Sequence, residues 1–267
     1  MLRLLRIEWL KVRTYKPFWI LLLINVIAFI GFMQIIAQIF FSVEISKSDE
    51  KGKLEVIRPF MEGPFLYPAI WATSAFFTSF LVPLCAILLI LNVCNEWNTR
   101  MLRQQVIEGM SRSEFLLAKL LGLVVFTLLM SIFFVISTLL VGKGSFELSN
   151  VVFNFALLMF SQFSLAFLLG LWLKRSVIAL AVFLAYMLIA EPLLVWFLKT
   201  NNLTQIVNFL PLEVSDRIIL PPEIFQFFSP EEYKARKEAV PQQIIFTILE
   251  LIVLWGITFG GFRKKDL

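Results

Sequence analysis

The chain has 267 residues, of which 59% are hydrophobic and 16% are charged, and its mean hydropathy is +0.85. A soluble domain has roughly a quarter charged residues and cannot bury this much apolar surface. The composition therefore excludes an ordinary cytosolic enzyme and a disordered chain. Histidine is absent, which excludes His-based triads, His proton relays and His metal sites.

Residues 2–16 predict an amphipathic helix lying in the plane of the membrane surface. Its apolar stripe at helical spacing is Leu2, Leu5, Trp9 and Val12. Its flanking cations, which can reach lipid head groups, are Arg6, Arg13 and Lys16. A plain basic flank to the first span is the alternative. The Lys16-Pro17 pair then turns the chain into the membrane.

Six segments are long and apolar enough to cross a bilayer, which takes about 20 mostly apolar residues. They are residues 18–41, 66–94, 115–141, 151–173, 176–198 and 242–262. Alternating segments typical of a β-barrel are not seen. The predicted fold class is therefore all-α, a single polytopic domain over residues 1–267.

The distribution of Lys and Arg predicts that both termini are cytoplasmic. With the N-terminus inside, the inner segments hold 14 Lys and Arg against five Asp and Glu, and the outer segments hold ten against 12. The overall charge of +5 then reflects topology and attraction to anionic lipid heads. It lacks the concentrated basic, aromatic-interleaved surface of a nucleic-acid site, so no nucleic-acid partner is expected.

The two long outer loops are predicted at residues 42–65 and 199–241. The second mixes prolines, apolar stretches and charges, which favours short interfacial or re-entrant helices. Within it, Ser229 and Pro230 predict the start of a charged helix, with serine as the N-cap. Residues 142–150 and 173–175 are expected to be tight turns.

Polar residues inside the spans are candidates for function because they are costly in a membrane. Glu191 lies toward the outer end of the fifth span, directly before Pro192, which can break the helix there, and Glu250 lies near the middle of the sixth. A proton, cation or ligand site is one interpretation, and hydrogen bonding to a neighbouring helix is the favoured one. Ser74 and Thr78 share a face of the second span and are expected to join helices.

Residues 96–108, between the second and third spans, predict a cytoplasmic helix that Gly109 ends. Ser111 and Glu114 then form a capping box that restarts a helix. A rigid helix that projects from the membrane can transmit a movement of a soluble partner to the spans. A basic loop that only anchors the topology is the alternative.

This loop, Glu96-x-x-x-Arg100 through Glu108-Gly109-Met110-Ser111-Arg112-Ser113-Glu114-Phe115-x-x-x-Lys119, resembles the cytoplasmic loop of type-2 ABC exporter permeases. The N-terminal sequence Leu4-Leu5-Arg6-Ile7-Glu8-Trp9-Leu10-Lys11, followed by Lys16-Pro17-Phe18-Trp19, is similar to the start of that family. The resemblance extends over the whole architecture, although the motifs themselves are loose.

The resemblance implies that the loop is a coupling helix seated in a groove of a separate ATPase. The residues it assigns to coupling are Glu96, Arg100, Arg103, Gln104, Glu108, Gly109, Arg112 and Glu114. It also implies two ATPase subunits and a second permease subunit, identical or not, with the second and fifth spans lining the pathway. The chain contains no G-x-x-x-x-G-K-[ST] sequence, so ATP and magnesium are expected on the partner and no cofactor on this chain.

The predicted function is therefore export of a hydrophobic or amphipathic substrate, such as a peptide antibiotic, lipid or drug, across a bacterial plasma membrane. The alternatives are a membrane scaffold and an intramembrane lipid-modifying enzyme. An intramembrane protease is excluded, since there is no histidine and no aspartate lies in a span. The polar residues of the 199–241 loop form only a thin cluster for a transferase: Glu213, Asp216, Arg217 and Glu223. Cys85 and Cys94, about 13 Å apart on a helix, are expected to be apolar packing residues without a disulfide or metal.

Overall fold

The computed structural model describes residues 2–46, 65, 67–142, 150–201 and 203–264, which form helices and no strand. The longer helices are α1 (Leu2–Thr14), α2 (Lys16–Ser46), α4 (Ala69–Ser79), α5 (Val82–Asn98), α7 (Arg112–Val141), α8 (Asn150–Leu173), α9 (Ser176–Ala185), α10 (Glu191–Thr200) and α14 (Pro230–Lys264). The short ones are α6 (Met101–Ile107), the π-helical turn η2 (Tyr186–Ala190), α11 (Thr204–Val207), α12 (Pro211–Asp216) and α13 (Phe225–Phe228).

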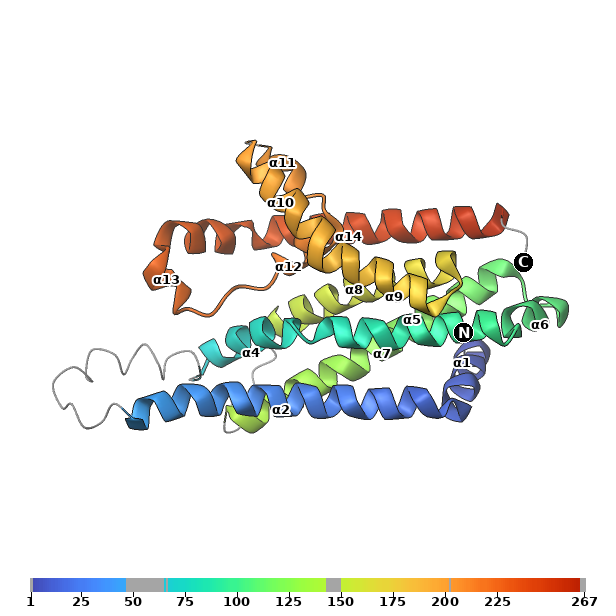
Figure 1. Ribbon diagram of the computed structural model, residues 1–267, viewed down its shortest axis with the longest axis horizontal. Helices are drawn as coiled ribbons and strands as arrows, with labels where there is room; N and C mark the ends of the chain where they lie inside the picture. The colour runs from blue at the N-terminus through green and yellow to red at the C-terminus, as the bar shows by residue number, and fades with distance from the viewer. Residues whose placement is uncertain (1, 47–64, 66, 143–149, 202, 265–267) are drawn as a thin grey trace.

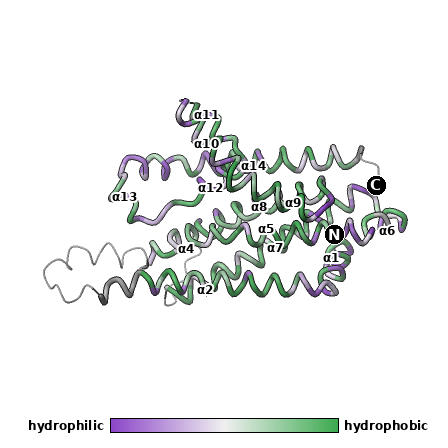
Figure 2. Tube along the Cα trace, in the orientation of Figure 1, coloured by the Kyte–Doolittle hydropathy of each residue, from purple (hydrophilic) through white to green (hydrophobic). Residues whose placement is uncertain are grey.

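The molecule is an all-α, membrane-embedded protein. Among the described residues, five helices are long and apolar enough to cross a membrane, and there are six if the bent pair α4 and α5 counts as one span. The described residues of all six predicted segments are helical, apart from turns at residues 67–68 and 80–81 of the second. The long helices lie side by side (Figure 1), and they are hydrophobic along most of their length (Figure 2).

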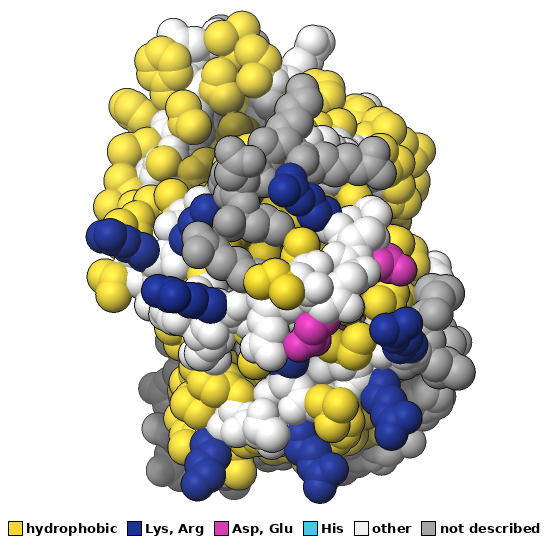
Figure 3. Space-filling model, turned by 90° about the vertical axis from the view of Figure 1, so that its right-hand side faces the viewer, with side chains coloured by type: hydrophobic (Ala, Val, Ile, Leu, Met, Phe, Trp, Pro, Cys, Tyr) yellow, Lys and Arg dark blue, Asp and Glu magenta, His cyan; other side chains and the backbone are white. Residues whose placement is uncertain are grey.

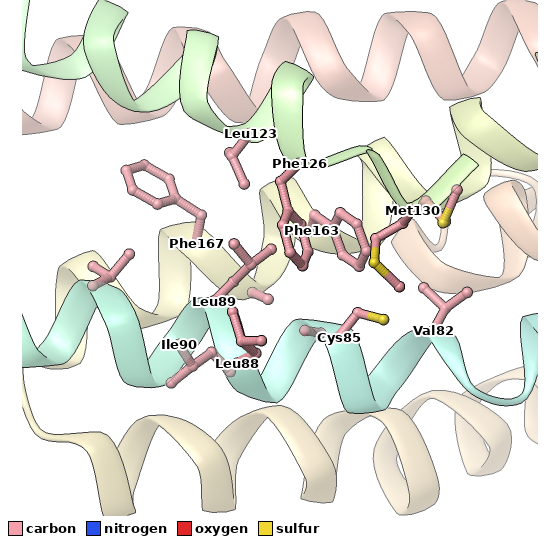
Figure 4. Close-up of a cluster of buried hydrophobic side chains, with 14 of the residues drawn as sticks. Val82, Cys85, Leu88, Leu89, Ile90, Leu123, Phe126, Met130, Phe163 and Phe167 are labelled. Carbon is pink, nitrogen blue, oxygen red and sulfur yellow. The ribbon is translucent and has the colours of Figure 1, made fainter. Parts of the chain in front are cut away.

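Helix α8 is the centre of the bundle. In its most apolar window 61% of the residues are buried, against 17% for the helix formed by α9, η2 and α10. Side chains of α5, α7 and α8 fill the core, among them Cys85, Phe126 and Phe163 (Figure 4). Gly170 lets α5 approach closely, since a Cβ there would lie 3.5 Å from the Cβ of Val93. Cys85 and Cys94 are buried free thiols, as predicted.

The second predicted span is bent rather than straight. Its two halves, α4 and α5, meet at an angle of 46°. Pro83 lies in the first turn of α5 and has no N–H to continue the hydrogen bonds of α4, which explains the break. The predicted fifth span is continuous over Ser176–Thr200, but its α-helix is interrupted directly before Pro192. The π-helical turn η2 precedes this proline, with the N–H of Glu191 donating to the carbonyl of Tyr186, and a widened turn accommodates the missing donor.

The predicted short helices of the 199–241 loop are α11, α12 and α13. The predicted helix start at Ser229 and Pro230 is confirmed, but the helix does not stop before the last span. Helix α14 instead runs from Pro230 through Pro241 to Lys264. Most of the predicted loop 42–65 and of the turn 142–150 lies outside the described residues.

Helix α1 lies across the end of the bundle, transverse to α2 (Figure 1), as expected for a helix parallel to the membrane surface. The break at Tyr15 separates it from α2, which starts at Lys16. Trp19 of α2 donates its indole N–H to the carbonyl of Val12 at 3.1 Å and meets the ring of Trp9 edge-on at 6.0 Å. These contacts fix the angle between the two helices.

Candidate functional site

The end of the bundle that carries α1 and α6, here called the α6 end, is rich in positive charge. Lys and Arg side chains are spread across this face, and few acidic ones accompany them (Figure 3). Exposed cations at this end are Arg3, Arg6, Arg13, Lys16, Arg100 and Arg175. These cations belong to segments that the sequence assigns to one side of the membrane.

Helix α6 is a separate short helix that projects from this end. Arg100 adopts a left-handed conformation with φ 57° and separates α6 from α5. Gly109 has φ +98° and ends α6, as predicted. The N–H of Gly109 donates to the carbonyl of Val106, and the N–H of Met110 donates to that of Gln105. This pair of bonds is a Schellman motif, which requires the positive φ that glycine tolerates.

The chain then re-enters the bundle through the predicted capping box. Ser111 Oγ accepts from the N–H of Glu114, whose carboxylate accepts from the N–H of Ser111 at 2.9 Å. Arg112 is the first residue of α7. The two ends of α6 are therefore fixed by local backbone geometry.

The prediction of one exposed helix over residues 96–108 is wrong. Residues 96–98 continue α5, and Glu96 is only 4% exposed. Of the other predicted coupling residues, Gln104 and Glu108 are exposed on or beside α6 and share a hydrogen bond of 3.0 Å. Arg103 belongs to α6, but its side chain is outside the described residues.

Glu96 belongs instead to a buried ring of four charges, here called the charge ring, formed by Glu8, Lys11, Glu96 and Lys119. Lys119 Nζ donates to Glu8 Oε2 at 2.6 Å and to Glu96 Oε1. Lys11 Nζ lies 2.7 Å from Glu8 Oε1 and 3.4 Å from Glu96 Oε2. Each carboxylate therefore bridges both lysines, and the formal charges cancel.

The charge ring joins helices that are distant in the sequence. Its side chains are only 6–11% exposed, and they come from α1, α5 and α7. Both ammonium groups also lie over the ring of Phe115, at 5.6 and 5.5 Å from its centroid. Lys11 Nζ donates in addition to Gln105 Oε1 of α6 at 3.2 Å. The amide of Gln105 thus connects the projecting helix to the buried ring.

The ring shifts the protonation equilibria of the two α1 residues. Burial would raise the pKa of Glu8, but the charges of Lys119 and Lys11 and their hydrogen bonds bring it below its ordinary value. Burial, with the charge of Lys119, lowers the pKa of Lys11. A buried ion pair of this kind persists only when each charge is closely matched.

The intramembrane polar candidates lie elsewhere in the bundle. Glu250 accepts a hydrogen bond from Ser161 of α8 at 3.3 Å, in agreement with the favoured interpretation of bonding between helices. Glu191 Oε1 accepts from the backbone N–H groups of Leu212 and Glu213 at 2.9 and 2.7 Å. Ser74 and Thr78 are buried in α4 and belong neither to the charge ring nor to the Glu191 contacts.

Glu191 also lines a cavity of about 380 Å³ together with residues of α8, α10 and α12. Asp216 of α12 lies on its wall and accepts from Gln162 Nε2 at 2.9 Å. Asp216 is exposed at the cavity, but the protein packed around its carboxylate and the charges of Glu213 and Glu191 raise its pKa to about 7, against the opposing charge of Arg236. No group of three or more Asp, Glu, Cys or His placed to hold a metal ion occurs among the described residues.

Comparison of the chain with protein-family models, with curated proteins and with solved structures gives no match. The features that bear on function are therefore the charge ring and the short helix α6.

Proposed function

We propose that the chain is the transmembrane subunit of an ATP-driven exporter, in which α6 docks into a groove of a separate ATPase subunit. Two such chains, or this chain and a related one, would assemble with two ATPase subunits in a bacterial plasma membrane. ATP and magnesium would bind to the ATPase, and the cargo would be hydrophobic or amphipathic. The connection of α6 to the charge ring is the observation that supports this proposal most directly.

The exposed surface of α6 fits a docking element. Ile107 is 85% exposed at the C-terminal end of this helix, beyond the hydrophobic bundle. Large apolar side chains at the centre of an interface supply much of its binding energy. The neighbouring Gln104 and Glu108 provide polar groups for the rim of such an interface.

The charge ring offers a route from α6 into the spans. A displacement of α6 would act through Gln105 on Lys11 of α1, and from there on Glu96 of α5 and Lys119 of α7. Each charge of the ring has two partners, so a displacement of one member acts on two others, and removing a member leaves a buried charge without its match. ATP-driven closure of two ATPase subunits would in this way tilt the spans between two arrangements, giving alternating access.

The proposed orientation, with the α6 end in the cytoplasm, predicts the labelling of single cysteines. Cys85 and Cys94 are first replaced by serine or alanine. Cysteine in place of the exposed Lys234 should then react in intact cells with a membrane-impermeant thiol reagent, whereas cysteine in place of the exposed Asn98 should react only after the cells are opened. Labelling of the Asn98 position alone in intact cells would invert the orientation.

The docking role of α6 is tested with Ile107→Asp. We expect an ATPase chain that carries a G-x-x-x-x-G-K-[ST] sequence to copurify with the natural protein. Its yield should fall about tenfold or more in the variant, because burial of a carboxylate in an apolar groove opposes binding. Thermal unfolding of the purified subunit should be unchanged, since Ile107 has almost no contacts within the chain.

Ile107→Leu is the matched control, because it keeps an apolar side chain of the same volume. It should retain copurification and substrate-stimulated ATP hydrolysis. If the ATPase is recovered equally with aspartate and with leucine at this position, α6 does not contact the ATPase. The loop would then serve only to anchor the topology.

A further inference from the structure

The cavity beside Glu191 contains an acceptor that the protein itself does not satisfy. Gln162 is 4% exposed and lines this cavity. Its Nε2 donates to Asp216, whereas its Oε1 is buried without a hydrogen-bond partner. A buried amide oxygen without a donor is costly, typically by 1–3 kcal/mol. Such an atom on a cavity wall indicates that a donor from outside the chain completes the site.

The charges of the cavity wall indicate which kind of donor. Three carboxylates line it, from Glu191, Glu213 and Asp216, and the one cation among its lining residues is Lys199. Glu213 is already paired with Arg217 at 2.8 Å, and Lys199 is exposed. Glu191 is buried, and its second oxygen, Oε2, makes no hydrogen bond. The cavity therefore offers two buried acceptors, Gln162 Oε1 and Glu191 Oε2, and beside them the exposed carboxylate of Asp216. The cation that acts on Asp216 is Arg236 of α14, whose guanidinium donates to the Asp216 backbone carbonyl at 3.5 Å.

The remaining wall is apolar. Met187, Val195, Trp196 and Leu212 line the cavity, whose volume is about 380 Å³. The acidic groups are not arranged to hold a metal ion within the described residues. A ligand that matches both the acidic and the apolar wall carries a charged N–H donor on an apolar body. An ammonium group supplies several N–H donors. The indole ring of Trp196 can make a cation–π interaction with the ammonium group or pack against the apolar body.

We propose that this cavity binds the primary ammonium group of a cationic amphiphile, which Asp216, Glu191 and Gln162 hold while Met187, Val195 and Trp196 contact its apolar body. The identification of this ligand as the exported cargo rests on the proposed function. The binding itself does not, because the chain alone forms the cavity. The ammonium group could belong to a small amine or to a lysine side chain of an amphipathic peptide.

The test is a binding titration with the purified full chain in phosphatidylcholine nanodiscs, without any ATPase. Phenethylamine is the probe, and phenethyl alcohol, of nearly equal size but uncharged, is its matched control. We expect saturable binding of the amine alone. A lysine-containing amphipathic peptide and the same peptide with acetylated lysine distinguish the two sources: selective binding of the unmodified peptide assigns the site to peptides, and binding of phenethylamine alone assigns it to small amines.

Variants of the wall locate the site. Asp216→Asn should weaken binding of the amine about tenfold or more, because it removes a charge-assisted hydrogen bond. Gln162→Met, which deletes the unpartnered oxygen at similar volume, should also weaken it and serves as the second test if Asp216→Asn does not fold. Glu223→Gln is the control, since this carboxylate is exposed in the same part of the chain and does not line the cavity. It should bind as the natural protein does.

Binding of the amine should also strengthen as the pH rises through about 7, because Asp216 is then ionised while the amine remains protonated. The charged groups that act on Asp216 are Glu213 of its own helix, Glu191 of α10 and Arg236 of α14. Equal binding of amine and alcohol together with equal binding of the two peptides, or full binding by both Asp216→Asn and Gln162→Met, would overturn the proposal. Copurification of an ATPase that depends on Ile107 would be unaffected by that result, so the two proposals fail separately.

Discussion

Replacement of Lys119 by methionine should destabilise the protein by about 3–5 kcal/mol, the range expected when one partner of a buried ion pair is removed. Lys119 donates to both carboxylates of the charge ring, and its side chain is 6% exposed. Without it, Glu8 and Glu96 would share the single charge of Lys11. One of them must then be protonated or remain a buried unmatched charge, and either outcome opposes folding.

Unfolding of the purified subunit in mild detergent, by heat or by denaturant, measures this effect. Lys16→Met is the matched control, because Lys16 is exposed at the start of α2 and is not in the ring. The double variant Glu8→Gln, Lys119→Met should recover part of the loss, since Lys11 and Glu96 then balance each other. A Lys119→Met protein as stable as Lys16→Met would show that the ring contributes nothing to stability.

Acidification should weaken the ring as well. The pKa of Glu8 is lowered from its ordinary value of 4.5 in the folded protein. Its contribution is therefore fully present above that ordinary value, and it is lost as the pH falls through the lowered folded value.

The sequence predicts the features that depend on neighbouring residues. Hydrophobic run lengths predict the long helices, Gly109 predicts the end of α6, and the spacing of Ser111 and Glu114 predicts the capping box. Each of these is fixed within a few residues of chain. The start of α14 at Pro230 belongs to the same class, since a proline is favoured in the first turn of a helix.

The charge ring could not be predicted in this way. Lys119 lies 111 residues from Glu8 and 23 from Glu96, so only the packing of three helices brings them together. In sequence, Lys11 and Lys119 look like ordinary cations at the cytoplasmic flank of a span. One sequence feature does point to the ring. Each of the two basic flanks contains an acidic residue, Glu8 or Glu96, and the positive-inside rule does not explain an acidic residue there.

The favoured interpretation of Glu191, hydrogen bonding to a neighbouring helix, is confirmed, but the sequence could not identify its partners. In sequence, Glu191 is a carboxylate beside a proline in an apolar span, with no partner nearby. Its partners are backbone N–H groups of α12, more than 20 residues later. Backbone donors carry no side-chain signature, so a prediction from residue types cannot find them.

Replacement of Glu191 by leucine is therefore expected to destabilise α12 and the cavity beside it. Leu212 and Glu213 occupy the first turn of α12, and Leu210, at its N-cap, has no side-chain acceptor. Glu191 Oε1 takes both of their N–H groups and so caps α12 from another helix. Loss of this acceptor should cost about 2–3 kcal/mol, since at least one buried donor is left unsatisfied.

Glu191→Gln separates the capping role from the charge, because the amide keeps one carbonyl oxygen of nearly the same position. We expect it to lose about 1 kcal/mol or less of unfolding free energy, while Glu191→Leu loses two to three times as much. Limited proteolysis supplies a local measurement, since a frayed α12 should be cut faster between residues 200 and 230 in the leucine variant alone. Equal loss in both variants would assign the effect to the negative charge of Glu191 rather than to the cap. Unchanged stability in the leucine variant would mean that water or another group accepts from the N–H groups of Leu212 and Glu213. Buried backbone donors that lose their acceptor otherwise lower the stability.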